Sequence, residues 1–208
     1  MKRARKPGSH GSTITEVMMA IALLSVGASG IISMQKAASL ANRNAKNLEI
    51  GNEIARTWIE RLRSDATKWN HPSPLNPNSD IDTDTMWLAN KVQQQGAPPV
   101  WFRPEDTTRS IYGVHDALGK DEMSGSKNGP FCVNMRLGYL RANQAIIRAE
   151  IRVYWLRQGV QYGGTTLTMQ PPNPLCGATT TAPPAVHGAN DVFHFVYATT
   201  AIAKNMAY

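Results

Sequence analysis

The sequence lacks the short motifs that mark common catalytic and metal centres. It has no Walker loop, no G-x-G-x-x-G phosphate cradle, no G-x-S-x-G nucleophile elbow and no H-E-x-x-H zinc motif. Its five histidines are scattered, and no histidine or cysteine has the spacing of a zinc site. These absences argue against the main classes of nucleotide-dependent, hydrolytic and zinc enzymes. We therefore expect the protein not to be an enzyme.

Clustered positive charge is missing from most of the chain. The formal net charge is +7, but Lys2, Arg3, Arg5 and Lys6 carry four of these charges within the first eleven residues. No cluster of lysines and arginines follows, so the remaining +3 is weak support for nucleic-acid binding. We do not expect nucleic acid as a partner.

One stretch of the sequence partly resembles a calcium-binding loop but lacks two of its required residues. Residues 80–84 place aspartates at alternate positions, as a calcium loop does. However, Thr85 stands where that loop needs its turn glycine, and Lys91 stands where it needs a bidentate acid. A turn that leads into a helix cap is the better interpretation, and we expect no metal or cofactor.

Charge is absent from residues 17–34, which form an apolar run of membrane-spanning length. The run is apolar on all sides, and the basic residues before it predict a cytoplasmic N-terminus with the remainder outside. Glu16 stands at the head of this run, where an ionisable side chain is costly and therefore points to a function. The main alternative is a secretory signal peptide cleaved after Ala41, but the length of the run and the position of Glu16 argue against it.

Gly11 is followed five residues later by Glu16, and the two stand between a basic leader and an apolar run. This arrangement resembles the type III signal of type IV prepilins and related pseudopilins. In these families a peptidase cuts after the glycine, methylates the new N-terminus and leaves a glutamate as the fifth mature residue. The resemblance implies cleavage between Gly11 and Ser12, N-methylation of Ser12, and a role for Glu16 in filament assembly. Ser12 replaces the large apolar residue, most often Phe, that usually stands there.

Gly27, Gly30 and Gln35 make the start of the chain most similar to the PilV group of minor pilins. That resemblance implies a protein of the inner membrane, with its C-terminal domain in the periplasm, that enters an extracellular pilus. Its implied partners are other minor pilins, the major pilin, the prepilin peptidase and the assembly platform, with an adhesin at the filament tip. The alternatives are a pseudopilin of type II secretion and a membrane-anchored periplasmic enzyme or binding module.

A single long helix is predicted over residues 15–66. Residues 36–66 contain no proline and one glycine, and they are rich in good helix formers. Apolar residues recur there at steps of three and four and make one face. These residues are Leu48, Gly51, Ile54, Ala55, Trp58, Ile59 and Leu62. The helix would be roughly 75 Å long. Gly27 and Gly30 would either allow close helix–helix contact or weaken the helix locally.

The remaining chain has room for one modest globular domain. Residues 67–130 contain seven prolines and predict a largely irregular region, with a short helix over 85–95 capped by Asp84 or Thr83. The expected organisation is a leader (1–11), a transmembrane or filament-core helix (12–35), its amphipathic continuation (36–66), a variable loop region (67–130) and a sheet domain with a disulfide loop (131–208). The variable region would be presented to an adhesin or a surface.

Alternating apolar and polar residues predict half-buried strands over 131–137 and 147–155. Gly163-Gly164 predicts a turn before a strand over 165–169, and residues 191–202 predict a final strand. Three or four antiparallel strands against the second half of the helix make an α+β fold, and this is the pilin fold that the resemblance implies.

Cys132 and Cys176 are the only cysteines, and both follow the membrane segment. An even pair in an oxidising compartment predicts a disulfide, and two buried free thiols are the alternative. Closing a loop of this length would stabilise the fold by about 4 kcal/mol in the loop-entropy description.

Overall fold

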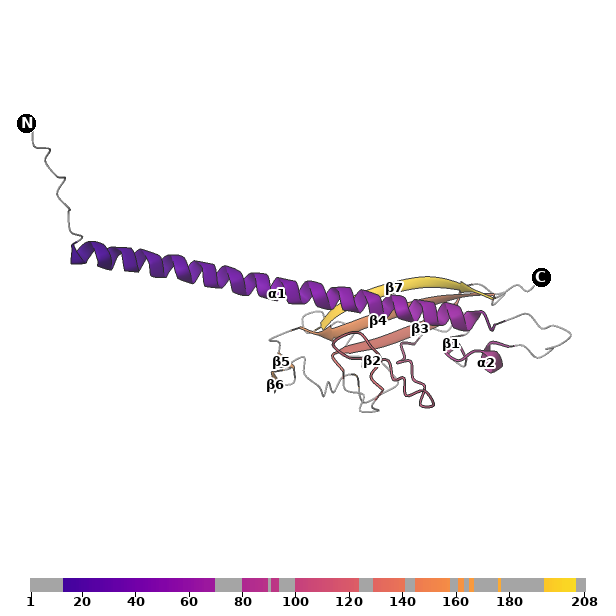
Figure 1. Ribbon diagram of the computed structural model, residues 1–208. Helices are drawn as coiled ribbons and strands as arrows, with labels where there is room; N and C mark the ends of the chain where they lie inside the picture. Colours follow the sequence, from indigo (N-terminus) through magenta and orange to yellow (C-terminus); the bar gives the residue numbers. More distant parts are fainter. Residues whose placement is uncertain are drawn as a thin grey trace, which may run out of the picture. The chain divides into compact units, whose positions relative to one another are not determined.

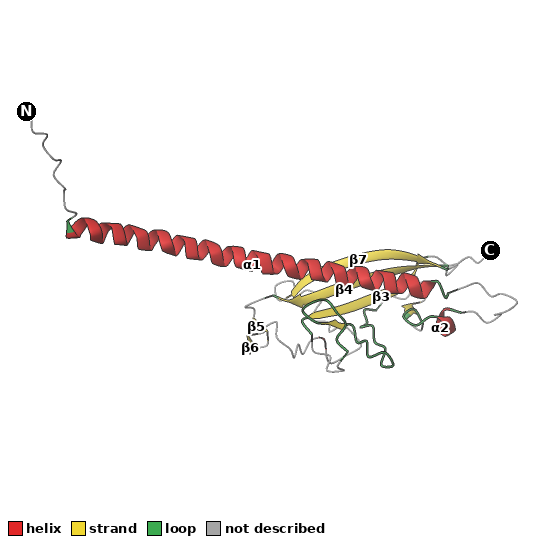
Figure 2. Cartoon of the chain, in the orientation of Figure 1, coloured by secondary structure: helices red, strands yellow, loops and turns green. Residues whose placement is uncertain are grey.

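The computed structural model describes residues 13–69, 80–89, 91–93, 100–123, 129–140, 145–157, 161–162, 165–166, 176 and 193–204. The chain divides into two compact units, Met1–Lys46 and Asn47–Tyr208. The second unit is an α+β domain, in which a helix packs on a small and mainly antiparallel sheet (Figure 1, Figure 2). This confirms the predicted α+β class.

Helix α1 spans Ile14–Ala66 and confirms the single helix predicted over 15–66. Within the second unit, its apolar face is buried at five of the seven predicted positions: Gly51, Ile54, Ala55, Trp58 and Leu62. Of the other two, Ile59 is half-buried against the core, whereas Leu48 is 48% exposed and lies outside the buried part of this face. A Cβ atom on Gly51 would lie 2.8 Å from the Trp155 ring, so the glycine permits a close approach of helix and sheet.

Three long antiparallel strands form the centre of the sheet: β3 (Phe131–Tyr139), β4 (Ile146–Leu156) and β7 (Phe193–Ala203). They confirm the three principal predicted strands, and they pair in the order β3-β4-β7. The strand predicted over 165–169 corresponds in its described part to β6 (Thr165–Thr166), which forms a separate two-stranded sheet with β5 (Gln161–Tyr162).

Short segments line the edge of β3 that does not pair with β4. Strand β1 (Val92–Gln93) pairs with it in parallel, and β2 (Val114–His115) pairs with it antiparallel. Between them, Phe102 and Met135 exchange two backbone hydrogen bonds of 2.9 and 2.8 Å. The irregular 67–130 region therefore supplies the backbone partners for this second edge of β3, in segments of one or two residues.

Both faces of β3 and β4 are buried over most of their length, so the prediction of half-buried strands is wrong there, although Arg148 stays exposed near one end of β4. The odd-numbered residues of β3 and β4 face the apolar core, and the even-numbered residues lie on the opposite face of the sheet. On that opposite face, Asn134, Glu150 and Arg152 are 2%, 8% and 0% exposed. The Trp101 ring covers this face, because the Arg152 guanidinium lies 4.5 Å and the Arg136 guanidinium 4.8 Å from its centroid. Stacking on an aromatic ring lets an arginine leave water while its charge stays compensated.

The helix predicted over 85–95 is also wrong. The helix of this region, α2, spans Ile81–Asp84. Its cap is Asp80, whose carboxylate accepts a hydrogen bond of 2.6 Å from the Ile81 N–H, rather than Asp84 or Thr83. The segment that follows α2 bends instead of continuing as a helix.

A buried carboxylate in the last turn of α1 explains this bend. Asp65 is 4% exposed and accepts hydrogen bonds from the backbone N–H groups of Met86, Trp87 and Leu88, with shortest distances of 2.9, 2.7 and 3.2 Å. The bend places Trp87 and Leu88 in the core, where the Trp87 ring meets the Trp58 ring edge-on at 5.0 Å. Tertiary packing therefore overrides the local helix propensity.

Replacing Asp65 by alanine is expected to lower the free energy of unfolding by about 3 kcal/mol, because it removes the acceptor of three backbone N–H groups. The measurement is denaturant unfolding of the full chain in neutral detergent, followed by tryptophan fluorescence. Glu60→Ala is the matched control, since Glu60 lies on the same helix with its side chain 63% exposed. If both substitutions cost the same free energy, the structural role of Asp65 would be refuted.

Candidate functional site

The N-terminal half of α1 is the strongest candidate for a functional surface. In its apolar run, every large hydrophobic side chain is at least 49% exposed: Val17, Met18, Met19, Ile21, Leu23, Leu24, Val26, Ile31, Ile32 and Met34. Among the described residues, α1 is the one helix that is long and apolar enough to cross a membrane, and no residue of its most apolar window is buried. A surface this apolar needs lipid or protein around it.

Glu16 lies in the first turn of α1. Its backbone N–H donates to the Thr13 carbonyl at 3.0 Å, and the Val17 N–H donates to the same oxygen at 3.3 Å. A carboxylate in the first turn is favoured by the partial positive charge of the helix N-terminus. Glu16 is exposed, and it is the only acidic residue between Thr13 and Glu49. The single negative charge of this surface is therefore available to a partner.

The polar side chains of the apolar run are satisfied within the helix. The hydroxyl groups of Ser25, Ser29 and Ser33 each donate to a backbone carbonyl three or four residues earlier, at 2.7 to 3.0 Å. A hydroxyl that bonds its own helix can enter an apolar medium without losing its partner. Sequence inspection missed these residues, although their spacing of four places three small side chains on one face.

Gly27 and Gly30 lie inside the continuous helix. A Cβ atom built on either glycine would meet nothing within 4 Å, so no contact within the chain requires these residues to be glycine. Both interpretations from the sequence, close approach of a second helix and local weakening of the helix, therefore stay predictions.

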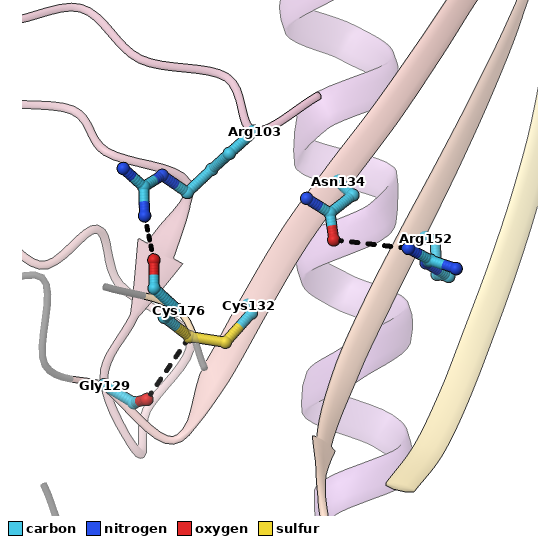
Figure 3. Close-up of a disulfide and its surroundings, with 6 residues drawn as sticks. All are labelled: Arg103, Gly129, Cys132, Asn134, Arg152 and Cys176. Carbon is cyan, nitrogen blue, oxygen red and sulfur yellow. Dashed lines mark hydrogen bonds between the residues drawn. A yellow bond between two sulfur atoms is a disulfide. The ribbon is translucent and has the colours of Figure 1, made fainter. Parts of the chain in front are cut away.

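The sequence-predicted site residues fall into separate places. Gly11 and Ser12, the expected cleavage and methylation site, lie outside the described residues. Glu16 belongs to the first unit, and Cys132 and Cys176 belong to the second. The two cysteines form a disulfide with their Cα atoms 5.6 Å apart, which confirms the predicted pairing (Figure 3).

The disulfide has a polar support that the sequence did not indicate. The Arg103 guanidinium donates to the Cys176 carbonyl oxygen (Figure 3). It also forms an ion pair of 3.2 Å with Glu105. The Cys176 sulfur lies 3.8 Å from the Gly129 carbonyl oxygen. Arg103 is 4% exposed, so its charge is held inside the domain next to the cross-link. This arrangement has the character of a structural site rather than a reactive one.

Within the described ranges, no group of three or more histidine, cysteine, aspartate or glutamate side chains could hold a metal ion. His115 lies in the core, and His194 stacks on the Trp155 ring at 5.6 Å between centroids. No protein-family model, no curated protein and no solved structure matches this chain.

Proposed function

We propose that the protein is a minor pilin that primes the assembly of a type IV pilus at the filament tip. The observation that carries this proposal is the exposed apolar half of α1 with one carboxylate, Glu16, in its first turn. The second half of the same helix belongs to an α+β domain cross-linked by Cys132 and Cys176. The resemblance of residues 1–35 to prepilins adds the leader and its cleavage site.

Before assembly, the apolar run would hold the protein in the inner membrane with its N-terminus in the cytoplasm. During assembly, helices of neighbouring subunits would replace the lipid around this surface. The internal hydrogen bonds of Ser25, Ser29 and Ser33 suit both environments, because neither offers water as a partner.

Glu16 would pair with the N-terminal amine of a neighbouring subunit. A buried carboxylate is tolerated when an opposite charge compensates it, and cleavage after Gly11 would create that charge on Ser12. The pair would set the axial register of the incoming subunit. The uncleaved basic leader would block this pairing, so cleavage would license assembly.

The test is Glu16→Ala in cells that make the filament. The variant is expected to insert in the membrane normally but to enter sheared filaments at least about tenfold less, because a buried amine is left unpaired at a cost of about 3–5 kcal/mol. The measurement is the ratio of filament-bound to membrane-bound protein. Intact mass of the membrane form should show a start at a methylated Ser12.

Glu49→Ala is the matched control, because Glu49 is the next acid along α1 and is exposed. It should assemble like the wild type. Normal incorporation of Glu16→Ala, or an intact mass that retains Met1, would overturn the proposal.

A further inference from the structure

A basic pocket of about 170 Å³ opens at the C-terminal end of α1, within the second unit. Its walls come from the last turns of α1 and the turn that follows them, from the bend after α2 and from the turn at Arg109. It is lined by Arg61, Ser64, Asp65, Lys68, Met86, Trp87 and Arg109. Three cationic side chains therefore face one carboxylate across a space that is small relative to sites for drug-sized molecules.

The one carboxylate that lines the pocket, Asp65, already has hydrogen-bond partners within the domain. Asp65 accepts three backbone hydrogen bonds from residues 86–88, at distances down to 2.7 Å. Successive backbone N–H groups of this kind form a concavity that binds anions. Asp65 fills that concavity as an internal ligand, so a second anion must be bound by side chains.

Arg61 is likewise committed within the domain. Its guanidinium holds the Asp121 carboxylate with both terminal nitrogens, one of them at 3.0 Å. It also lies over the Trp58 ring, 4.6 Å from the centroid. Arg61 therefore adds positive potential to the pocket but is not its principal donor.

Lys68 and Arg109 keep donors for a ligand. Lys68 is exposed, and among the described residues no carboxylate lies within 4.0 Å of its ammonium group. The Arg109 side chain is 61% exposed, and its pairing with Asp106 is long, at 3.9 Å. Its other contact is with the Met86 sulfur, a weak acceptor. The apolar part of the pocket lining comes from Met86 and Trp87.

We propose that this pocket binds a glutamate or aspartate side chain of an acidic peptide segment from a partner protein. The Lys68 ammonium and the Arg109 guanidinium would take the carboxylate, and the Met86 and Trp87 surface would take its methylene groups. A peptide carboxylate suits this site better than free phosphate, because Asp65 occupies the backbone donors that phosphate would use. Binding at this pocket can be measured on the protein alone, without a filament.

The experiment is calorimetric titration of the full chain, in neutral detergent at low salt, with a six-residue peptide of alternating glutamate and glycine. We expect saturable binding that weakens as salt is added, since the cations are exposed. The double variant Lys68→Ala/Arg109→Ala should weaken binding at least about tenfold, because it removes two charge-assisted hydrogen bonds. The same peptide with glutamine in place of glutamate should not bind.

Arg56→Ala/Arg63→Ala is the matched control, because it removes two exposed positive charges from α1 outside the pocket. It should change the affinity less than about twofold if the pocket, rather than net charge, binds the peptide. Equal weakening by both double variants would overturn the proposal, as would absence of binding. Inorganic phosphate that binds as tightly as the peptide would also overturn it, in favour of a site for small anions.

Discussion

Replacing Cys132 and Cys176 together by alanine is expected to lower the free energy of unfolding by about 4 kcal/mol. The two cysteines are 44 residues apart in the sequence, and their cross-link closes a loop whose entropy in the unfolded chain would otherwise oppose folding. Most small domains have a total stability of about 5–15 kcal/mol, so this loss is a large fraction of it.

The location of the disulfide supports this magnitude. Cys132 and Cys176 are 0% and 2% exposed, and they belong to a small apolar cluster that is separate from the main core. The cluster also contains Val114, Tyr154, Leu156 and Phe193. Without the cross-link, Cys176 would be held there by this cluster and by the Arg103 guanidinium. The substitution therefore also weakens the attachment of Cys176 to the sheet.

The measurement is denaturant unfolding of the full chain in neutral detergent, with and without a thiol reductant. In oxidising buffer the wild type should be about 4 kcal/mol more stable than the double variant. In reducing buffer the two proteins should unfold at nearly the same denaturant concentration. A difference that persists under reducing conditions would show that packing of the sulfur atoms, and not the cross-link, supplies the stability.

Regular elements of this fold could be predicted from the sequence because each carries a periodic pattern. Helix α1 and strands β3, β4 and β7 were located to within a few residues. Steps of three and four mark residues 36–66 of the helix, and alternation marks β3 and β4. The predicted disulfide is also present. For the candidate site, Glu16 was found because it is one acid beside a long uncharged run.

The features that were missed depend on contacts between segments distant in the sequence. The pattern around Arg152 predicted a solvent-facing strand surface, and nothing local indicates that Trp101 covers it. The bend at residues 86–88 depends on Asp65, which lies 21 to 23 residues earlier. The basic pocket likewise depends on residues that are distant in the sequence, since Arg109 lines it together with the end of α1. Irregular segments have no period, so their partners cannot be read from the sequence.

Acidification is expected to destabilise the second unit through one buried histidine. His115 is 1% exposed, and burial lowers its pKa from 6.5 to about 4. Its Nε2 accepts a hydrogen bond of 3.0 Å from the Trp58 indole N–H, and its Nδ1 lies 3.2 Å from the Gly119 carbonyl oxygen. The neutral ring with its proton on Nδ1 satisfies both contacts. A second proton on Nε2 would face an indole N–H that can only donate.

The charges around His115 oppose one another. Asp121, 3.7 Å from Nδ1, and Asp116 raise the pKa, as does the hydrogen bond to Gly119, whereas Arg61 lowers it. Arg61 and Asp121 form an ion pair, so much of the effect of Asp121 on the ring is cancelled. Burial therefore dominates, and the folded protein binds fewer protons than the unfolded chain between about pH 6.5 and pH 4.

Stability from this histidine is fully present above about pH 6.5 and is lost as the pH falls towards 4, by about 3 kcal/mol in total. The measurement is the free energy of unfolding of the full chain in neutral detergent at several pH values in this window. His115→Gln keeps a side-chain acceptor for the Trp58 N–H but cannot gain a charge, so its stability should fall less steeply than that of the wild type. His194→Gln is the control, because His194 is half-buried and should leave most of the wild-type slope in place. Carboxylates contribute equally to all three proteins, and the difference between the wild-type and His115→Gln slopes therefore isolates this ring. If those two slopes were the same, His115 would have to be protonated or exposed in the folded domain, and the Trp58 hydrogen bond would not form as described.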